Sequence, residues 1–180
     1  YSKYTAGGNF TGHISKMIAG FQEKQKQVAE AIVKGDFKSF LDIGTSEGGM
    51  IKTVASQDKN MVAVGVDPNL EMQKNFNSTP KVPNAEYRLE AFQGSWTEDD
   101  GTIIEEFKTE QKFDVVNEDF TFQFVNNNRA KQVAGVKELM SKDGIFITSE
   151  KFHTANEAAN EAKKYDHQRK YFSPDQLTED

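Results

Sequence analysis

The stretch that decides the fold reads Phe40-Leu41-Asp42-Ile43-Gly44-Thr45-Ser46-Glu47-Gly48-Gly49. Its first four residues predict a short buried strand, the glycines predict a turn, and a helix is expected from about Met50 to Ser56. Glycine tolerates positive φ and lets the backbone approach a ligand closely. A strand, a glycine-rich turn and a helix in succession are typical of the first unit of a parallel α/β sheet.

The alternation of strands and helices continues along the whole chain. Further strands are predicted at 61–66, 87–92, 113–116 and 145–148, and helices at 10–34, 69–76, 103–107, 133–140 and beyond 154, with a last helix starting at Ser173-Pro174. Gly20 is expected to kink the first helix, Gly35 to stop it, and Gly144 to stop the helix before the fifth strand.

Strands separated by helices predict parallel pairing. We therefore expect an α/β fold with a doubly wound, Rossmann-like, mostly parallel sheet that lacks its last strands in this chain. The apolar runs 61–66 and 145–148 predict strands buried on both faces. The expected organisation is a single domain over 1–180, with a helical lid at 1–36 and a core at 37–180 that is truncated at its C-terminal end.

The composition excludes several function classes. The chain has 180 residues, of which 36% are hydrophobic, so one globular domain is expected. It has no Cys, which excludes disulfides and thiolate chemistry, and its three scattered His residues favour no metal site. A net charge of −6 disfavours nucleic acid as a partner. There is no apolar run long enough to span a membrane and no visible signal peptide, so a cytoplasmic location is expected.

Two features are predicted at the carboxyl ends of the strands, where open α/β sheets bind ligands. One is the glycine turn, and the other is Asp67, which lies 23 residues after Gly44 at the end of the second strand. A carboxylate there can accept both hydroxyls of a ribose, so a nucleoside-containing cofactor is predicted. The alternatives are a ligand-free tight turn for the glycines and a helix N-cap before Pro68 for the carboxylate.

The dinucleotide fingerprint G-x-G-x-x-G fits poorly, because Ser46 occupies its second glycine, and no P-loop lysine is present. The pattern instead resembles motif I of the class I S-adenosylmethionine (SAM)-dependent methyltransferases, with Asp67 as the acidic ribose-binding residue of motif II.

Two stretches sharpen the resemblance. Phe120-Thr121-Phe122-Gln123-Phe124 and Ser149-Glu150-Lys151-Phe152, with the segment Phe10–Phe21, are similar to the carboxy-SAM synthase family of the tRNA wobble-uridine oxyacetate pathway. This resemblance implies a homodimer in which prephenate donates a carboxyl group to SAM, giving carboxy-SAM and phenylpyruvate. The sequence departs from the family where Phe21 replaces a Tyr, Ala19 a Pro and Asp119 an Asn. The family's carboxylate-binding Arg would follow Asp180.

The resemblance implies a set of cofactor-binding residues for SAM, S-adenosylhomocysteine or carboxy-SAM. Glu90 or Ala91 is expected near the adenine, Phe21 over the ligand, and Asp119 near the amino acid part. The full expected set is Phe21, Asp42, Gly44, Thr45, Ser46, Gly48, Asp67, Pro68, Glu90, Ala91, Phe92 and Asp119.

A role for Asp119 can also be predicted without reference to the family. A carboxylate at the mouth of the central strand can pair with an ammonium group, or orient or deprotonate an acceptor. Glu118 is the competing candidate for this catalytic role, and the structural alternative is that one of the two caps the next helix. Phe92 and Trp96 are candidates to stack on an adenine, but aromatic residues in such positions are more often core.

The first functional hypothesis is a SAM-dependent methyltransferase that acts on a small-molecule acceptor. The second is carboxy-SAM synthesis at the same site, and the third is a SAM-binding subunit without activity. A nicotinamide dehydrogenase is disfavoured by Ser46.

Overall fold

The computed structural model describes residues 16–150 and 156–171. The described chain divides into two compact units, Val28–Glu150 and a second unit formed by Tyr1–Gln27 with Lys151–Asp180. The second unit includes α7 (Glu157–Gln168), where the buried Gln168 donates from Nε2 to the carbonyl of Met17 over 3.4 Å. Helix α3 (Phe21–Lys34) runs across the boundary between the units.

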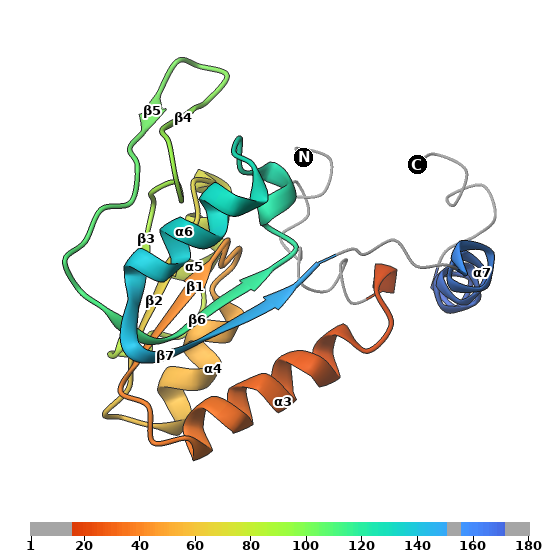
Figure 1. The fold of residues 1–180 in the computed structure, drawn as a ribbon, viewed down its shortest axis with the longest axis horizontal. Helices are drawn as coiled ribbons and strands as arrows, with labels where there is room; N and C mark the ends of the chain where they lie inside the picture. Colours follow the sequence, from red (N-terminus) through yellow and green to blue (C-terminus); the bar gives the residue numbers. More distant parts are fainter. Residues whose placement is uncertain (1–15, 151–155, 172–180) are drawn as a thin grey trace. The chain divides into compact units, whose positions relative to one another are not determined.

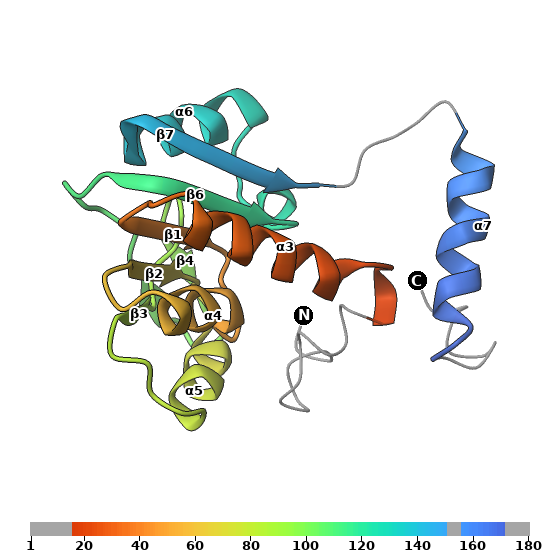
Figure 2. The ribbon, with the colours of Figure 1, turned by 90° about the horizontal axis from the view of Figure 1, so that it is seen from below.

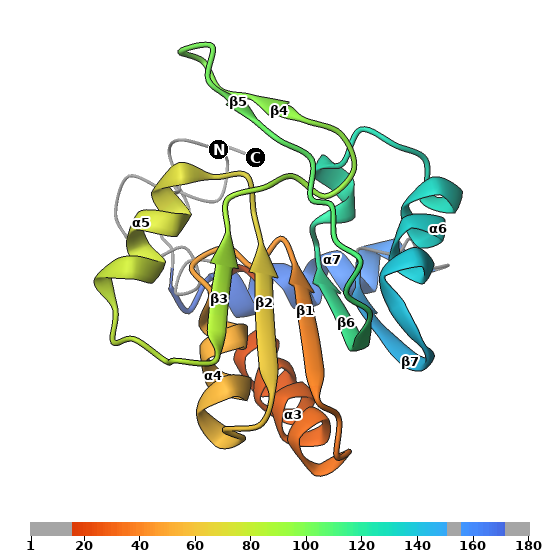
Figure 3. The same cartoon turned by 90° about the vertical axis from the view of Figure 1, so that its left-hand side faces the viewer.

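The larger unit is built on a five-stranded parallel sheet in the order β3-β2-β1-β6-β7. Figure 3 shows the strands side by side with their carboxyl ends at one edge. Their bounds are β1 (Ser39–Ile43), β2 (Val62–Val66), β3 (Ala85–Arg88), β6 (Phe113–Asp119) and β7 (Met140–Ser149). The predicted Rossmann-like α/β fold is confirmed.

Helices cover both faces of the sheet (Figure 1). One face packs on the end of α3 and on α4 (Gly49–Gln57), with Phe40, Ile51 and Val115 fully buried between them. The other face of the sheet packs on α6 (Arg129–Leu139) and on the chain segment around Phe92 and Phe107. Helix α5 (Leu70–Ser78) follows β2, and the side chain of Asn69 caps its N-terminus by accepting from Glu71 N and Met72 N. Seen from below in Figure 2, α6 lies beside β7 at one end of the strand order and α4 lies beside β2 and β3 toward the other.

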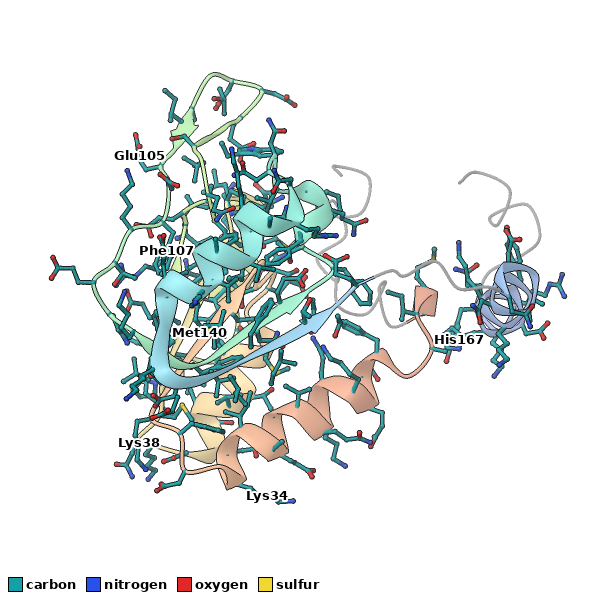
Figure 4. The ribbon with its side chains drawn as sticks, in the orientation of Figure 1. Lys34, Lys38, Glu105, Phe107, Met140 and His167 are labelled. Atoms are coloured by element: carbon teal, nitrogen blue, oxygen red, sulfur yellow. The ribbon has the colours of Figure 1, made fainter. Side chains whose placement is uncertain are left out.

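Asp114 joins three strands at the opposite, amino-terminal edge of the sheet. Its Oδ2 accepts from the backbone N–H groups of Lys38 over 2.8 Å and Ser39 over 3.2 Å, and its Oδ1 accepts from Ser141 Oγ over 3.1 Å. Figure 4 labels Lys38 and Met140, which mark this edge at the starts of β1 and β7. Donation by the Lys38 N–H is the main reason that the pKa of Asp114 lies below its ordinary value.

The leading helix is shorter than predicted. The continuous helix begins at Phe21, directly after Gly20, whose φ of +77° breaks it, and residues 10–15 lie outside the described part. It ends at Lys34 as predicted, but the residue in the left-handed region is Asp36 (φ 57°) rather than Gly35.

The prediction of a helix at 103–107 is wrong. This segment forms a two-stranded antiparallel hairpin, in which β4 (Trp96–Thr97) pairs with β5 (Ile103–Ile104). The predicted strand 87–92 is likewise displaced, because β3 ends at Arg88, and Ala91 instead makes an isolated bridge to Glu106.

The expectations for the fifth strand need two corrections. Helix α6 already ends at Leu139, so Gly144 does not stop it but lies inside β7. The run 145–148 is not buried on both faces, because β7 is the edge strand of the described sheet and leaves Ile145 42% exposed. The last predicted helix at Ser173-Pro174 lies outside the described residues.

Removing the Asp114 carboxylate tests its role at the amino edge. We expect Asp114→Ala to lower the free energy of unfolding by about 1–2 kcal/mol at pH 7, because two backbone N–H groups lose a charged acceptor at a site that water still reaches. Since the folded-state pKa is lowered, the difference from the parent is present at neutral pH and shrinks as pH falls below 3.8. Urea unfolding at pH 7 and pH 3.5 measures it.

The matched control is Asp143→Ala, which removes an exposed carboxylate from β7. It should change the stability by less than about 0.5 kcal/mol. Equal losses in the two variants would mean that Asp114 does not join the strands.

Candidate functional site

The turn after β1 is held in an unusual backbone conformation. Gly44 and Gly48 both have φ of 71°, and Ser46, a residue with a side chain, has φ of 52°. The N–H groups of Gly44 and Thr45 donate to the carbonyl of Val66 over 2.8 and 3.2 Å, which fixes the turn against the end of β2. Residues in the left-handed region carry strain that the surrounding structure must hold in place.

Two of the glycines are required by packing inside the protein. A Cβ on Gly44 would lie 1.9 Å from Thr121 Oγ1, and one on Gly48 would lie 2.3 Å from Phe76 Cδ2. At Gly49 a Cβ would meet nothing within 4 Å. The glycines were predicted to let a ligand approach the backbone; in the structure the space beside Gly44 and Gly48 is filled by the side chains of Thr121, which follows β6, and of Phe76 from α5.

Asp67 ties the glycine turn to the start of α5. Its Oδ2 accepts from Ser46 N over 3.0 Å and its Oδ1 from Asn69 N over 2.9 Å. Burial raises the pKa of Asp67 to about 6, although both backbone hydrogen bonds oppose the shift. The N-cap of α5 is Asn69, so Asp67 and Pro68 precede the cap rather than form it.

A buried polar network joins β1 to β6 beneath the turn. Asp42 accepts from Thr45 Oγ1 over 2.8 Å and from Asn117 Nδ2 over 2.7 Å, and all three residues are buried. Asn117 Oδ1 is buried without a hydrogen-bond donor. Sequence reasoning missed Asn117; the available signal was a polar residue inside the apolar run that begins β6.

Glu118 performs the capping role. Its Oε1 accepts from Thr121 N over 2.6 Å and Phe122 N over 3.0 Å, which caps the short η1 helix (Phe122–Phe124), and its Oε2 accepts from Thr148 Oγ1 over 2.6 Å. Burial raises the pKa of Glu118, and the nearby charge of Glu150 adds to the shift. Asp119 ends β6 and is half-buried at the carboxyl edge.

Glu90, Ala91 and Phe92 follow β3 at the same edge. Glu90 Oε2 is buried and has no hydrogen-bond partner. Ala91 is held by backbone bonds to Glu105 and Phe107, and Phe92 stacks on the ring of Phe122 with a centroid distance of 5.8 Å. Phe92 is therefore a core residue, whereas Trp96 is 47% exposed on the hairpin.

The two sequence segments that resemble carboxy-SAM synthases meet at this edge. Phe120 N donates to the carbonyl of Ser149 over 2.8 Å, and Glu150, only 8% exposed in its side chain, pairs with Arg129 over 3.2 Å. Lys151-Phe152 and Phe10–Ile14 lie outside the described residues. Phe21 begins α3 in the other unit, and its role over the ligand stays a prediction.

The described residues contain no group of three or more His, Asp or Glu side chains that could hold a metal ion. None of their helices is long and apolar enough to cross a membrane.

No protein-family model matches the chain, and no curated protein matches it by sequence. Solved structures match its fold. The plantazolicin methyltransferase BpumL, in complex with a desmethylPZN analog and SAH, has a TM-score of 0.64 and 13% identity over 94% of this chain and 60% of its own.

Two further solved structures show the same fold. CalS10, an amino pentose methyltransferase from Micromonospora echinaspora, matches at a TM-score of 0.56 and 17% identity over 79% of this chain and 56% of its own. Coclaurine N-methyltransferase matches at a TM-score of 0.54 and 18% identity, over 71% of this chain and 36% of its own. The chain thus has the class I methyltransferase fold and spans between about a third and two thirds of these three proteins.

Adding one methyl group at Gly44 tests the packing of the turn. We expect Gly44→Ala to cost at least about 2 kcal/mol of unfolding free energy, because the Cβ meets Thr121 and the left-handed φ disfavours a side chain. Gly49→Ala is the matched control. It adds the same methyl group to open space at the start of α4 and should be neutral or stabilising by up to about 1 kcal/mol. Similar losses in both would contradict the packing explanation.

Asp67→Asn tests how much burial of the Asp67 carboxylate lowers the free energy of unfolding. The folded-state pKa of about 6 lies above the ordinary 3.8, so the parent protein loses stability as pH rises through this window. The loss amounts to up to about 3 kcal/mol. We expect Asp67→Asn to gain up to this amount relative to the parent between pH 4 and pH 8.

Urea unfolding of both proteins at the two pH values measures this difference. The amide also replaces one acceptor of a backbone N–H, but that change is the same at both pH values. A relative stability that does not depend on pH would show that Asp67 titrates normally.

Proposed function

We propose that this chain binds SAM at the carboxyl edge of its sheet and catalyses transfer of the methyl group to a small-molecule acceptor. The observation that carries the proposal is the hydrogen bond from Ser46 N to Asp67 Oδ2. It places a buried carboxylate against the glycine turn, at the position where sheets of this type bind nucleosides.

The residues present fit such a cofactor. Each oxygen of Asp67 accepts one backbone N–H, and a carboxylate oxygen has capacity for a second donor, so both remain available to the hydroxyls of a ribose. Glu90 Oε2, buried without a donor, suits the exocyclic amino group of adenine. Of the three methyltransferases that share the fold, two are in complex with SAH and one with SAM, which supports the same class of ligand here.

SAM supplies an activated methyl group on a sulfonium when it is bound. The protein then has to bind and orient the acceptor and to exclude water from the site. We assign the orienting role at the acceptor to Asp119 rather than Glu118, because both oxygens of Glu118 already hold the η1 helix and Thr148. Asn117 would act through Asp42, since its amide fixes that carboxylate under the glycine turn.

Carboxy-SAM synthesis is the second candidate. The observation that favours it is that the Phe120–Phe124 segment and the Ser149-Glu150 segment, which resemble that family, are hydrogen-bonded to each other at the same edge. Both candidates use the same SAM site and differ in what the protein releases. A SAM-binding subunit without activity would use it too.

Thermal shift and mass spectrometry test the proposal on the full chain. We expect millimolar SAM to raise the melting temperature, and the protein purified without added ligand to release SAM or S-adenosylhomocysteine on denaturation. Release of carboxy-SAM would instead support the second candidate. If SAM at this concentration left the melting temperature unchanged, the proposal would be wrong.

Asp67→Ala is the corresponding variant. We expect SAM to bind about tenfold to hundredfold more weakly, because the ribose hydroxyls lose a charged acceptor. Asp143→Asn, which removes a carboxylate from the amino half of β7, should bind SAM like the parent. Isothermal titration calorimetry of the three proteins measures the affinities, and equal affinities would remove Asp67 from the site.

A further inference from the structure

The β4–β5 hairpin projects beyond the carboxyl edge of the five-stranded sheet, on the side of the proposed SAM site (Figure 3). Its stem is anchored. Ala91 and Phe107 are joined by a backbone hydrogen bond of 2.8 Å, and both are buried together with Phe92. Glu105 and Phe107, labelled in Figure 4, stand on the segment that returns from the hairpin. The hairpin is therefore anchored at its base.

The two strands of the hairpin present large apolar side chains to water. Trp96 is 47% exposed and Ile103 is 60% exposed. Because Trp96 pairs with Ile104 and Thr97 with Ile103, the two exposed side chains lie on opposite faces of the ribbon. Exposed apolar groups on a projecting element are characteristic of interaction surfaces.

The charge around this surface is predominantly negative. Residues 94–108 include five acidic residues, Glu98, Asp99, Asp100, Glu105 and Glu106, and one basic residue, Lys108, which pairs with Glu106 over 3.4 Å. Each strand of the sheet also ends within two residues of a carboxylate: Asp42, Asp67, Glu90, Asp119 and Glu150. Arg88 and Arg129, at this edge, are already paired with Glu86 and Glu150. The local potential therefore attracts cations and repels anions.

We propose that the Trp96 face of the β4–β5 hairpin is the docking surface for the methyl acceptor, and that the acceptor is a small organic cation carrying an apolar group. The face of an indole ring attracts a cation, and the surrounding carboxylates raise its local concentration. A second copy of this acidic chain is disfavoured as the occupant, since it would bring like charges together. The proposal rests on the proposed function, which makes this edge the site of the reaction.

Trp96 is the single Trp of the chain, so its fluorescence reports on this surface alone. The probes are phenethylammonium and 3-phenylpropanoate, which have the same phenethyl body and opposite charges. We expect the ammonium probe to shift Trp96 emission with an affinity at least about fivefold higher than that of the carboxylate probe. Raising the ionic strength to about 0.15 M should reduce this preference.

A charge-neutral hairpin separates the role of its carboxylates from the fold. The test variant combines three substitutions in the hairpin, Glu98→Gln, Asp99→Asn and Asp100→Asn. The matched control combines three substitutions at exposed acids toward the amino edge, Glu110→Gln, Glu138→Gln and Asp143→Asn. We expect the preference for the ammonium probe to fall to about twofold or less in the test variant and to persist in the control.

Two results would overturn the proposal. One is a carboxylate probe that binds as tightly as the ammonium probe, and the other is Trp96 emission that neither probe changes up to its solubility limit. The thermal shift by SAM is measured in the same proteins. A normal SAM shift without probe preference rejects the docking surface alone, whereas a missing SAM shift rejects the proposed function.

Discussion

Burial of the Asp67 carboxylate is the constraint around which the edge of the sheet is organised. A carboxylate removed from water destabilises the protein unless donors surround it, and here the donors are backbone N–H groups of the two turns that follow β1 and β2. Meeting that demand fixes Ser46 in a left-handed conformation and holds the glycine turn against β2. These hydrogen bonds offset only part of the cost of burying the carboxylate, because the pKa of Asp67 remains raised to about 6. A site that keeps a poorly solvated charge at a ligand-binding edge is a common arrangement in proteins that bind small molecules.

The parts of the fold with strong local signals were predictable. Strand β1, its glycine turn and α4 follow each other within about twenty residues, and each is specified by its own sequence. The hairpin was misread because Ile103, Ile104 and Phe107 have helical spacing. The Asp100-Gly101 pair, with Gly101 at a φ of +86°, was the competing turn signal. For β7 the apolar residues indicated a strand, but composition does not tell an edge strand from a central one.

The local structure of the candidate site was predictable where a residue acts close to its own turn, as for the turn at Gly44 and the carboxylate of Asp67 after β2, whereas their role toward a ligand stays a prediction. It was not predictable where the partner is distant in sequence. Asn117 meets Asp42 across 75 residues, and nothing near Asn117 indicates that pairing. Which of Glu118 and Asp119 caps the η1 helix likewise depends on the face of β6 that each side chain occupies. Glu118 shares its face with Thr148 of the neighbouring strand, and this follows from the register of β6 with β7.

The strand order has a consequence for how the chain folds. Strands β3, β2 and β1 are consecutive in sequence and form one half of the sheet, whereas β1 pairs on its other side with β6, about 75 residues later. The Asp42–Asn117 hydrogen bond spans this seam, so it forms only after residue 117 has left the ribosome. Until then β1 presents an open edge. Closing the seam requires the long intervening segment to be ordered, and we expect the entropy of that closure to slow folding more than the formation of any local element does.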